Sequence, residues 1–345
     1  MKARIRIQEV AAAAGVSIGT ASDGINGKGR MSEATRRRIR ETATTLGYRP
    51  HHAARSLRQG RSGLIGMILR AYSPGMHGGL SYFAELISLS TVDALAHGYA
   101  LVVIPSEQAL DGAAWLPLDA AIVADPVDDD PVLPALRARG IPMVTDWSLA
   151  QDPDVICVDH DHAATMHAVL DHFAEQGARS MGLLTGGASD HYTRVSVAAF
   201  HAWCAERRLP GAVEWAKEAP VDSALRLLDH RDRPDAIFSL WAVAGHAMLE
   251  AARRRSLQVP ADLLLACADD MAYTTTNPPL TTVSFQPRLM SEAGGPLLGA
   301  ALAGDFPEQP NRLVPTMLTI RASSSRTPGP ERSVVIQPRI PEAHR

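Results

Sequence analysis

The first 62 residues differ sharply in charge from the rest of the chain, and this division constrains the fold most. They contain 13 Lys and Arg residues against four Asp and Glu, whereas all 345 residues contain 34 basic and 37 acidic residues. The remainder therefore holds 21 basic and 33 acidic side chains. The whole chain has a net charge of −3, but its N-terminal part is basic, and this composition favours binding to a polyanion.

Apolar spacing in the basic part predicts two short helices joined by a tight turn, and then a third helix. Gly15 lies where the turn needs an unusual backbone angle, and Ser17 is a good N-cap residue for the second helix. We expect the second helix at about 18–26 and the third at about 33–46, ending at Gly47. The residues expected to face inward on the first two helices are Val10, Ala13, Ala14, Val16, Ala21 and Ile25. A charged tail without structure would lack this spacing.

Several motifs follow one another in this part: VAAAAGVSIGTAS, ING, MSEATRRRIRETATTLGYRP and HHAARSLRQGRSGLIGMIL. Their order and spacing resemble the lac repressor and galactose repressor family of bacterial transcription regulators. The resemblance implies a homodimer whose second helices enter two major-groove half-sites of a double-stranded DNA operator. It also implies hinge helices that pair in the minor groove, where Leu57 would separate a base step.

Carried over by position, the resemblance predicts which residues contact DNA. The second helix would contact base edges and the groove. The third helix and its flanks would contact phosphates, and the hinge would contact the minor groove. The predicted residues are Ser17, Ile18, Gly19, Thr20, Ser22, Asp23 and Asn26, then Ser32, Thr35 and Tyr48, and finally Ala54, Leu57 and Arg58. Relatives usually carry arginine at the position of Asp23. A carboxylate can only accept hydrogen bonds, so we expect a different operator sequence.

The acidic remainder alternates short apolar runs with helical patterns, which is typical of parallel sheets covered by helices on both faces. Strands are expected at 64–69, 101–105, 120–123, 141–145, 155–158, 180–184, 236–240 and 263–267, and helices at 82–96, 131–139, 162–176, 194–207 and 243–256. About 280 residues exceed one comfortable core and favour two subdomains.

The family resemblance implies a body similar to periplasmic sugar-binding proteins, with two doubly wound α/β lobes and three crossovers, near 158–162, 284–288 and 313–319. We therefore divide the chain into an all-α helix–turn–helix domain at 1–50, a hinge and linker at 51–62, and an effector-binding body at 63–345. The N-lobe would comprise about 63–160 and 288–315, and the C-lobe about 161–287 and 316–330.

A small-molecule effector would bind between the lobes, at the carboxyl ends of the strands. The resemblance assigns this role to Tyr82, Phe83, Asp146, Trp147, Arg194, Ser196, Trp241 and Asp269. Relatives carry arginine at the position of Ser196 and an Asn-Asp pair at 241–242, so this chain has lost polar recognition groups. A sugar, a nucleobase or a related metabolite, a less polar or aromatic molecule, or no effector at all remain open.

A run of acidic and histidine residues at 159–162, followed by His167 and His172, raises the question of a metal site. His162 and His167 are five residues apart, so they do not align as zinc ligands on one helix face. We therefore expect these residues to be solvated helix caps, and we expect neither a metal nor another cofactor. The three cysteines lie in apolar or helical stretches and are expected to be buried thiols.

Two other classes of function fit the sequence less well. A solute-binding protein without a DNA role is disfavoured by the basic N-terminal part and by the absence of a signal-peptide pattern. An enzyme on the same lobes is disfavoured because no catalytic constellation or nucleotide-binding motif is evident. No apolar run is long enough to span a membrane, so we expect a cytoplasmic protein. Residues 323–330 are rich in Ser, Pro and Gly and are expected to be flexible.

Overall fold

The computed structural model divides the chain into two compact units, Met1–Gly63 and Leu64–Arg345, called here the headpiece and the body. It describes residues 5–48, 61–69, 80–105, 116–127, 130–146, 155–186, 190–216, 220–241, 243–268, 275–327 and 329–339.

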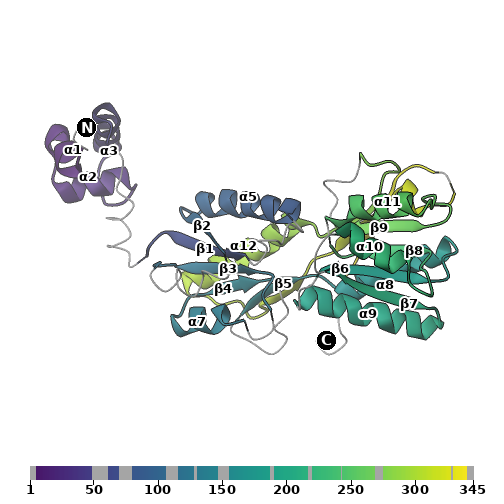
Figure 1. The fold of residues 1–345 in the computed structure, drawn as a ribbon. Helices are drawn as coiled ribbons and strands as arrows, with labels where there is room; N and C mark the ends of the chain where they lie inside the picture. Colours follow the sequence, from purple (N-terminus) through teal and green to yellow (C-terminus); the bar gives the residue numbers. More distant parts are fainter. Residues whose placement is uncertain are drawn as a thin grey trace. The chain divides into compact units, whose positions relative to one another are not determined.

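Within residues 5–48, the headpiece consists of three helices: α1 (Ile7–Ala14), α2 (Ile18–Ile25) and α3 (Glu33–Leu46) (Figure 1). The side chains of Ser17 and Ser32 accept backbone N–H groups in the first turns of α2 and α3. Each cap satisfies one donor that the helix start leaves unpaired. The predicted bounds of the second and third helices and the Ser17 cap are therefore confirmed.

Small apolar side chains fill the centre of the headpiece, so its helices approach closely. The buried apolar residues are Val10, Ala11, Ala14, Ala21, Ile39 and Ala43. Ala13, which was expected to face inward, is exposed, and Ala11 lies in the core instead. A Cβ atom added at Gly24 would lie 2.6 Å from Cδ1 of Ile39. Gly24 is therefore required by the packing of α2 on α3.

The N-lobe of the body is built on a parallel sheet. Its strands are β1 (Leu64–Leu69), β2 (Ala100–Pro105), β3 (Ala120–Ala124), β4 (Met143–Thr145), β5 (Ile156–Asp159) and β11 (Asn311–Leu313). They lie in the order β11-β5-β4-β3-β1-β2, and all their pairings are parallel. Helices α5 (Leu80–Ala96) and α12 (Pro287–Ala303) cover one face, and α7 (Val132–Ala138) covers the other (Figure 1).

The C-lobe has a second sheet, with strands β6 (Met181–Gly186), β7 (Gly211–Ala216), β8 (Ala236–Ser239), β9 (Leu264–Ala268), β10 (Thr281–Ser284), β12 (Thr316–Ile320) and β13 (Arg332–Ile336). Their order is β13-β12-β10-β9-β8-β6-β7. Helices α8 (His162–Glu175) and α9 (His191–Arg207) pack on one face, and α10 (Pro220–Leu228) and α11 (Ala244–Arg254) on the other. Doubly wound lobes are thus confirmed, although β12 pairs antiparallel with both of its neighbours.

The chain crosses between the lobes three times. It leaves the N-lobe after β5, returns between β10 and α12, and leaves again between β11 and β12. These are the three segments in which crossovers were expected. They place the carboxyl ends of β5 and β10 beside the same junction, where side chains from both lobes can meet.

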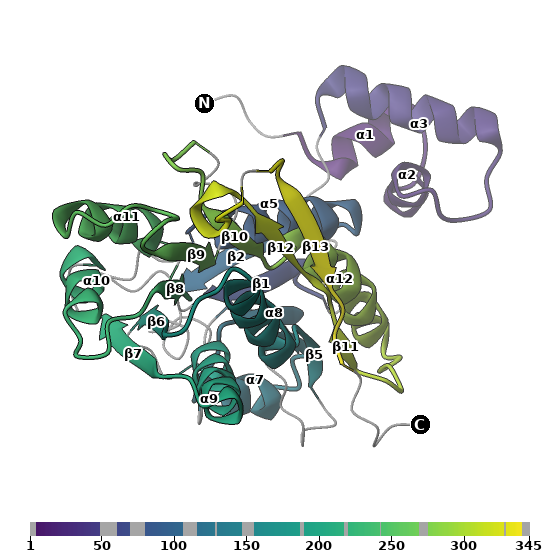
Figure 2. The same ribbon diagram turned by 90° about the vertical axis from the view of Figure 1, so that its right-hand side faces the viewer.

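The expectation of a flexible tail at 323–330 is wrong at the start of that segment. A short 3-10 helix, η2 (Ala322–Ser324), buries Ser323 and Ser324 completely. The hydroxyl of Ser323 donates to the carbonyl oxygen of Leu265 at 2.7 Å. Strand β13 then pairs with β12 at the sheet edge (Figure 2). Pro328 lies outside the described residues.

Candidate DNA-binding surface and effector site

The start of α2 presents an exposed polar and apolar surface on the headpiece. Ser17, Gly19 and Asp23 are exposed, and Ile18 keeps 47% of its surface accessible. An isoleucine this exposed at the start of a helix suits contact with a partner surface better than packing within the headpiece. Of the described residues expected on the recognition surface, Thr20 is partly buried, while Asn26 is exposed and caps the end of α2.

Ser22 departs from this arrangement because it is buried, with 8% of its surface accessible. The amide nitrogen of the Asn26 side chain donates to the backbone oxygen of Ser22 at 2.8 Å. Ser22 thus faces the interior of the headpiece and supports α2 from within.

The residues expected to contact phosphate lie at the two ends of α3. Ser32 is exposed at its start, next to the half-buried Thr35, and the two side-chain oxygens are 2.8 Å apart. Tyr48 follows the last turn and is half-buried. Arg37, Arg38 and Arg40 are exposed on the same helix and keep this surface positive. Ala54, Leu57 and Arg58, the expected hinge contacts, lie outside the described residues.

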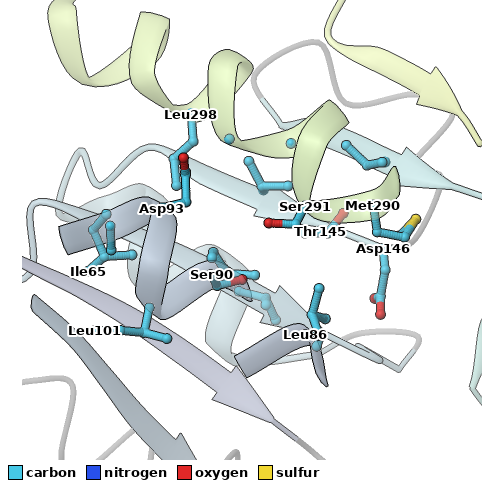
Figure 3. Close-up of a pocket in the computed structure, with 18 residues that line it drawn as sticks. Ile65, Leu86, Ser90, Asp93, Leu101, Thr145, Asp146, Met290, Ser291 and Leu298 are labelled. Atoms are coloured by element: carbon cyan, nitrogen blue, oxygen red, sulfur yellow. The ribbon is translucent and has the colours of Figure 1, made fainter. Parts of the chain in front are cut away.

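In the body, a cavity opens at the carboxyl ends of β3 and β4 and runs between α5 and α12 (Figure 3). We call it the N-lobe cavity. The space open to the centre of a water-sized sphere is about 60 Å³. Asp146, at the end of β4, is the one expected effector residue among its lining residues. Leu86 and Met290 lie beside Asp146 in Figure 3.

Asp146 is a half-buried carboxylic acid with an altered protonation equilibrium. Its Oδ1 accepts the backbone N–H of Asp125 at 2.7 Å, and Asp125 has a left-handed backbone with φ 57°. Burial raises the pKa of Asp146 to about 7, and the negative charge of Asp159 adds to this rise. Near neutral pH the site therefore holds a carboxyl group that a ligand bearing a proton donor or a positive charge would stabilise.

Tyr82 lies within electrostatic range of this carboxyl group and next to Phe83 on α5. Their rings meet edge to face with centroids 5.2 Å apart. Burial raises the pKa of the Tyr82 hydroxyl, and the charges of Asp146, Asp159 and Asp125 raise it further. The tyrosine therefore stays neutral beside the carboxylates and can donate a hydrogen bond.

The other predicted effector residues are scattered. Arg194 is exposed on α9, whereas Ser196 on the same helix keeps only 1% of its surface accessible. Trp241 is partly buried and packs against the core that β8 and β9 form with α10 and α11. None of these three residues lines the N-lobe cavity. Trp147 and Asp269 lie outside the described residues.

The histidines after β5 are buried, which corrects the expectation of solvated caps. His160 and His162 keep 6% and 7% of their surface accessible, and His172 keeps 5%. The Nε2 atom of His172 lies 2.8 Å from the hydroxyl of Ser324. Only Asp161 behaves as expected, because its carboxylate accepts the backbone N–H of Ala164 as the N-cap of α8. His167 is half-buried.

Asp159 ties the two lobes together through histidines. Its two oxygens lie 3.0 Å from Nε2 of His162 and 3.5 Å from Nε2 of His191. Burial alone would raise the pKa of Asp159, but the hydrogen bonds from these histidines lower it below the usual range. The carboxylate therefore stays charged.

An aromatic group completes this junction. The ring of Tyr192 lies 4.9 Å from that of His162 and 5.2 Å from that of Phe285, centroid to centroid. We call Asp159, His160, His162, His191, Tyr192 and Phe285 the crossover cluster. Within the part of the chain that the structure describes, no three His, Cys, Asp or Glu side chains could hold a metal ion.

All three cysteines are buried and free, as expected. Among the described helices, none is both long and apolar enough to cross a membrane.

Comparison with known proteins decides the family. The profile of bacterial regulatory proteins of the lacI family matches residues 6–51, and the periplasmic binding protein-like domain profile matches 170–324. The HTH-type transcriptional regulator PtxS of Pseudomonas plecoglossicida is 33% identical over 292 residues, which cover 79% of this chain and 81% of PtxS. The chain belongs to the lacI family of bacterial transcription regulators.

Other members of the lacI family are similar over nearly their whole length. The HTH-type transcriptional regulator MalR of Staphylococcus xylosus is 23% identical over 93% of this chain and 98% of MalR. A lac repressor dimer bound to operator and the anti-inducer ONPF has a TM-score of 0.80 and 21% identity, covering 94% of this chain and all of that chain. The CelR–cellobiose complex has a TM-score of 0.66 and 22% identity, covering 93% of this chain and all of that chain. These structures share the fold described above.

Proposed function

We propose that this lacI-family regulator is a cytoplasmic repressor without enzymatic activity, which binds a pseudo-palindromic operator as a homodimer. The observation that carries the proposal is the surface at the start of α2, where Ser17, Ile18 and Gly19 are exposed beside a helix rich in arginine. Exposed residues at the N-terminal end of a recognition helix read base edges, while arginines on the neighbouring helix neutralise phosphates.

Exposed apolar side chains support the homodimer. Val92 and Leu95 on α5 keep 67% and 62% of their surface accessible, and Val103 on the edge strand β2 keeps 40%. α5 packs beside β2, so these side chains belong to neighbouring elements. An apolar helix face next to the strand that ends the described sheet is a surface that a second copy can cover.

A small-molecule effector would bind at the carboxyl ends of β3 and β4, in contact with Asp146, Tyr82 and Phe83. Ligands of doubly wound sheets bind at such strand ends. The effector would alter operator affinity only if it bound one arrangement of the lobes more tightly than the other. The crossover cluster lies at the connections between the lobes, so a change in the arrangement of the lobes would alter its contacts.

A gel-shift experiment on the DNA upstream of the protein's own gene tests the proposal. We expect the full chain to shift one or more fragments at concentrations that leave random DNA of equal length unbound. A chain lacking residues 1–60 should retain the body and lose this binding. Equal affinity for upstream and random fragments at all salt concentrations would overturn the proposal, because only the charge-driven part of binding would remain.

A further inference from the structure

The N-lobe cavity is long and narrow because two matching rows of side chains form its sides. α5 contributes Leu86, Ser90 and Ala94, and α12 contributes Met290, Gly294 and Leu298. Each row has a spacing of four residues, so both rows face the cavity from one side of their helix. Eight residues of helix correspond to a length of about 12 Å. The cavity is thus an elongated channel lying along two helices.

Small residues in the middle of both rows keep the channel open. Ser90 and Gly294 occupy the central position of each row, where a larger side chain would fill the space. A Cβ atom at Gly294 would lie 3.5 Å from Val144 and 3.6 Å from Val158, so this glycine already rests on the sheet. Most of the other lining residues are apolar, including Ile122 and Val144 on the sheet.

A carboxyl group lies at each end of the channel. Figure 3 shows Asp146 on the side of Leu86 and Met290, and Asp93 on the opposite side, near Leu298. Asp93 can approach α12 because its neighbour there is a glycine: a Cβ atom at Gly295 would lie 2.7 Å from Oδ2 of Asp93.

The polar groups between these ends are hydroxyls. Ser90 and Ser291 face the channel in Figure 3. The side chains of Thr145 and Cys157 form a hydrogen bond with each other. Among the described lining residues there is no Lys, Arg or His. The channel therefore offers two carboxyl groups and an apolar interior. At its Asp93 end, Nδ1 of the exposed His97 lies 3.5 Å from Oδ1 of Asp93.

We propose that this channel binds an unbranched aliphatic α,ω-diamine, with one ammonium group at Asp146 and the other at Asp93. The proposal deepens the effector role given above and rests on it, because it names the chemical class of that effector. The apolar methylene chain matches the walls, and each ammonium group meets a carboxylate.

Competing ligand classes fit the channel less well. A fatty acid would place its own negative charge beside Asp146 or Asp93. A sugar would set hydroxyl groups against Leu86, Ile122 and Val144, where they would find no hydrogen-bond partners. Burial raises the pKa of Asp146 to about 7, and a neighbouring ammonium group would restore its charged form.

A ligand in the channel would act on the proposed dimer surface through helix α5. α5 carries Ser90 and Asp93 on its channel side and the exposed Val92 and Leu95 on its outer side. A ligand that sets the distance between α5 and α12 would therefore also position the proposed dimer surface.

Calorimetric titration of the full chain tests the proposal with α,ω-diamines of four to ten carbons, n-alkylamines and α,ω-diols of equal length. We expect one diamine length to bind best, with the monoamine at least tenfold weaker and the diol weaker still. Asp146→Asn should weaken the best diamine at least tenfold. Asp93→Asn should reduce the diamine to the affinity of the monoamine.

Two leucine variants test the position of the ligand. Ser90→Leu should abolish diamine binding by filling the channel, whereas Ser88→Leu, the same change on the exposed side of α5, should leave it unchanged. No diamine binding, equal binding of the diol, or unaltered binding by Ser90→Leu and Asp146→Asn would overturn the proposal.

The same protein samples separate this proposal from the proposed function. Operator binding without ligand, together with no diamine binding, would overturn the channel assignment alone. Diamine binding without operator binding would overturn the regulatory function and leave the channel assignment in place.

Discussion

The Nδ1 atom of His160 lies 2.9 Å from the carbonyl oxygen of Val314, and this contact joins the first crossover between the lobes to the third. The ring of His160 also lies 5.3 Å from that of Phe285, centroid to centroid, in the second crossover. One imidazole therefore contacts all three connections. Its Nε2 is buried and has no hydrogen-bond partner among the described residues.

The stability of the body should depend on pH through His160. Burial lowers the pKa of His160 to about 4, whereas an unfolded histidine titrates near 6.5. The unfolded chain therefore binds a proton more readily between these values, so this contribution to stability is present above about pH 6.5 and declines as the pH falls toward 4. His160→Phe should flatten the pH dependence of the free energy of unfolding in this window. The same variant should lose about 1–3 kcal/mol at pH 7.5, because the Val314 carbonyl loses its donor. Denaturant unfolding at several pH values measures both effects, and an unaltered pH dependence would refute the assignment.

Asp146 should have the opposite pH dependence. Because its folded pKa is raised to about 7, the folded chain holds the proton more tightly than the unfolded chain. Stability from this group is full at pH values below about 4 and declines as the pH rises through 7. Asp146→Asn, which can still accept the N–H of Asp125, should therefore stabilise the body at pH 8 more than at pH 5. One unit of pKa shift corresponds to about 1.4 kcal/mol, so a difference of a few kcal/mol is expected. Thermal unfolding of both proteins at the two pH values provides the comparison, and equal differences would contradict the raised pKa.

Gly24 should resist replacement by alanine, although alanine is the better helix former by about 1 kcal/mol. The new Cβ would lie 2.6 Å from Ile39 Cδ1, so we expect a loss of about 1–3 kcal/mol in the headpiece. Gly19→Ala is the matched control, because its nearest neighbour would be Ser17 Oγ at 3.8 Å. Amide hydrogen exchange of residues 5–48 in the full chain reports the local stability of each variant. Greater protection in Gly24→Ala than in the parent would show that the packing argument is mistaken.

The proposed dimer surface predicts the effect of a charge on α5. Leu95→Asp should yield monomers and weaken operator binding, because a carboxylate would be buried against the second copy. Ala135→Asp places the same charge on the exposed side of α7, on the opposite face of the N-lobe sheet, and should leave the dimer intact. Sedimentation at micromolar concentration distinguishes the two states. A dimeric Leu95→Asp protein would place the interface elsewhere.

Because Asp23 stands where relatives usually carry arginine, we expect an operator that differs from those of relatives. Its carboxylate is exposed on α2 and accepts hydrogen bonds, for example from the amino groups of cytosine or adenine. Asp23→Arg should change the preferred base at one position of each half-site, with arginine favouring guanine. Sequencing of DNA selected by the parent and the variant gives the two preferences. An identical pair of profiles would remove Asp23 from base recognition.

Much of the fold follows from local sequence patterns. The caps at Ser17 and Ser32 and the turn at Gly15 depend on residues next to them in the sequence. The apolar run at 64–69 forms a largely buried strand, as its composition indicates. Strand β7 and helix α10 were not predicted, although both lie in the region between the predicted helix at 194–207 and the strand at 236–240. β13 is mostly exposed and gains its structure from pairing with β12, which a local pattern cannot reveal.

The candidate site could be predicted only in part. Asp146 and Tyr82 were assigned through family position; Asp146 follows β4, and Tyr82 lies in the first turn of α5, near enough for the charge of Asp146 to raise its pKa. Arg194 and Ser196 were also assigned by position, but their opposite exposures depend on how α9 packs. The crossover cluster combines residues from β5, α8, α9 and the segment before α12, so only the folded chain brings them together. The channel depends on the small size of Ser90 and Gly294, a signal visible only once α5 and α12 are known to face each other.

Selection from a random pool of double-stranded DNA tests the central claim most directly. The full-length protein should enrich one motif with two inverted half-sites, and each half-site should need one headpiece of a homodimer. Binding to the enriched sequence should weaken steeply with salt and still exceed binding to scrambled DNA at every salt concentration. Failure to enrich any sequence, or enrichment of a single half-site bound by a monomer, would contradict the account.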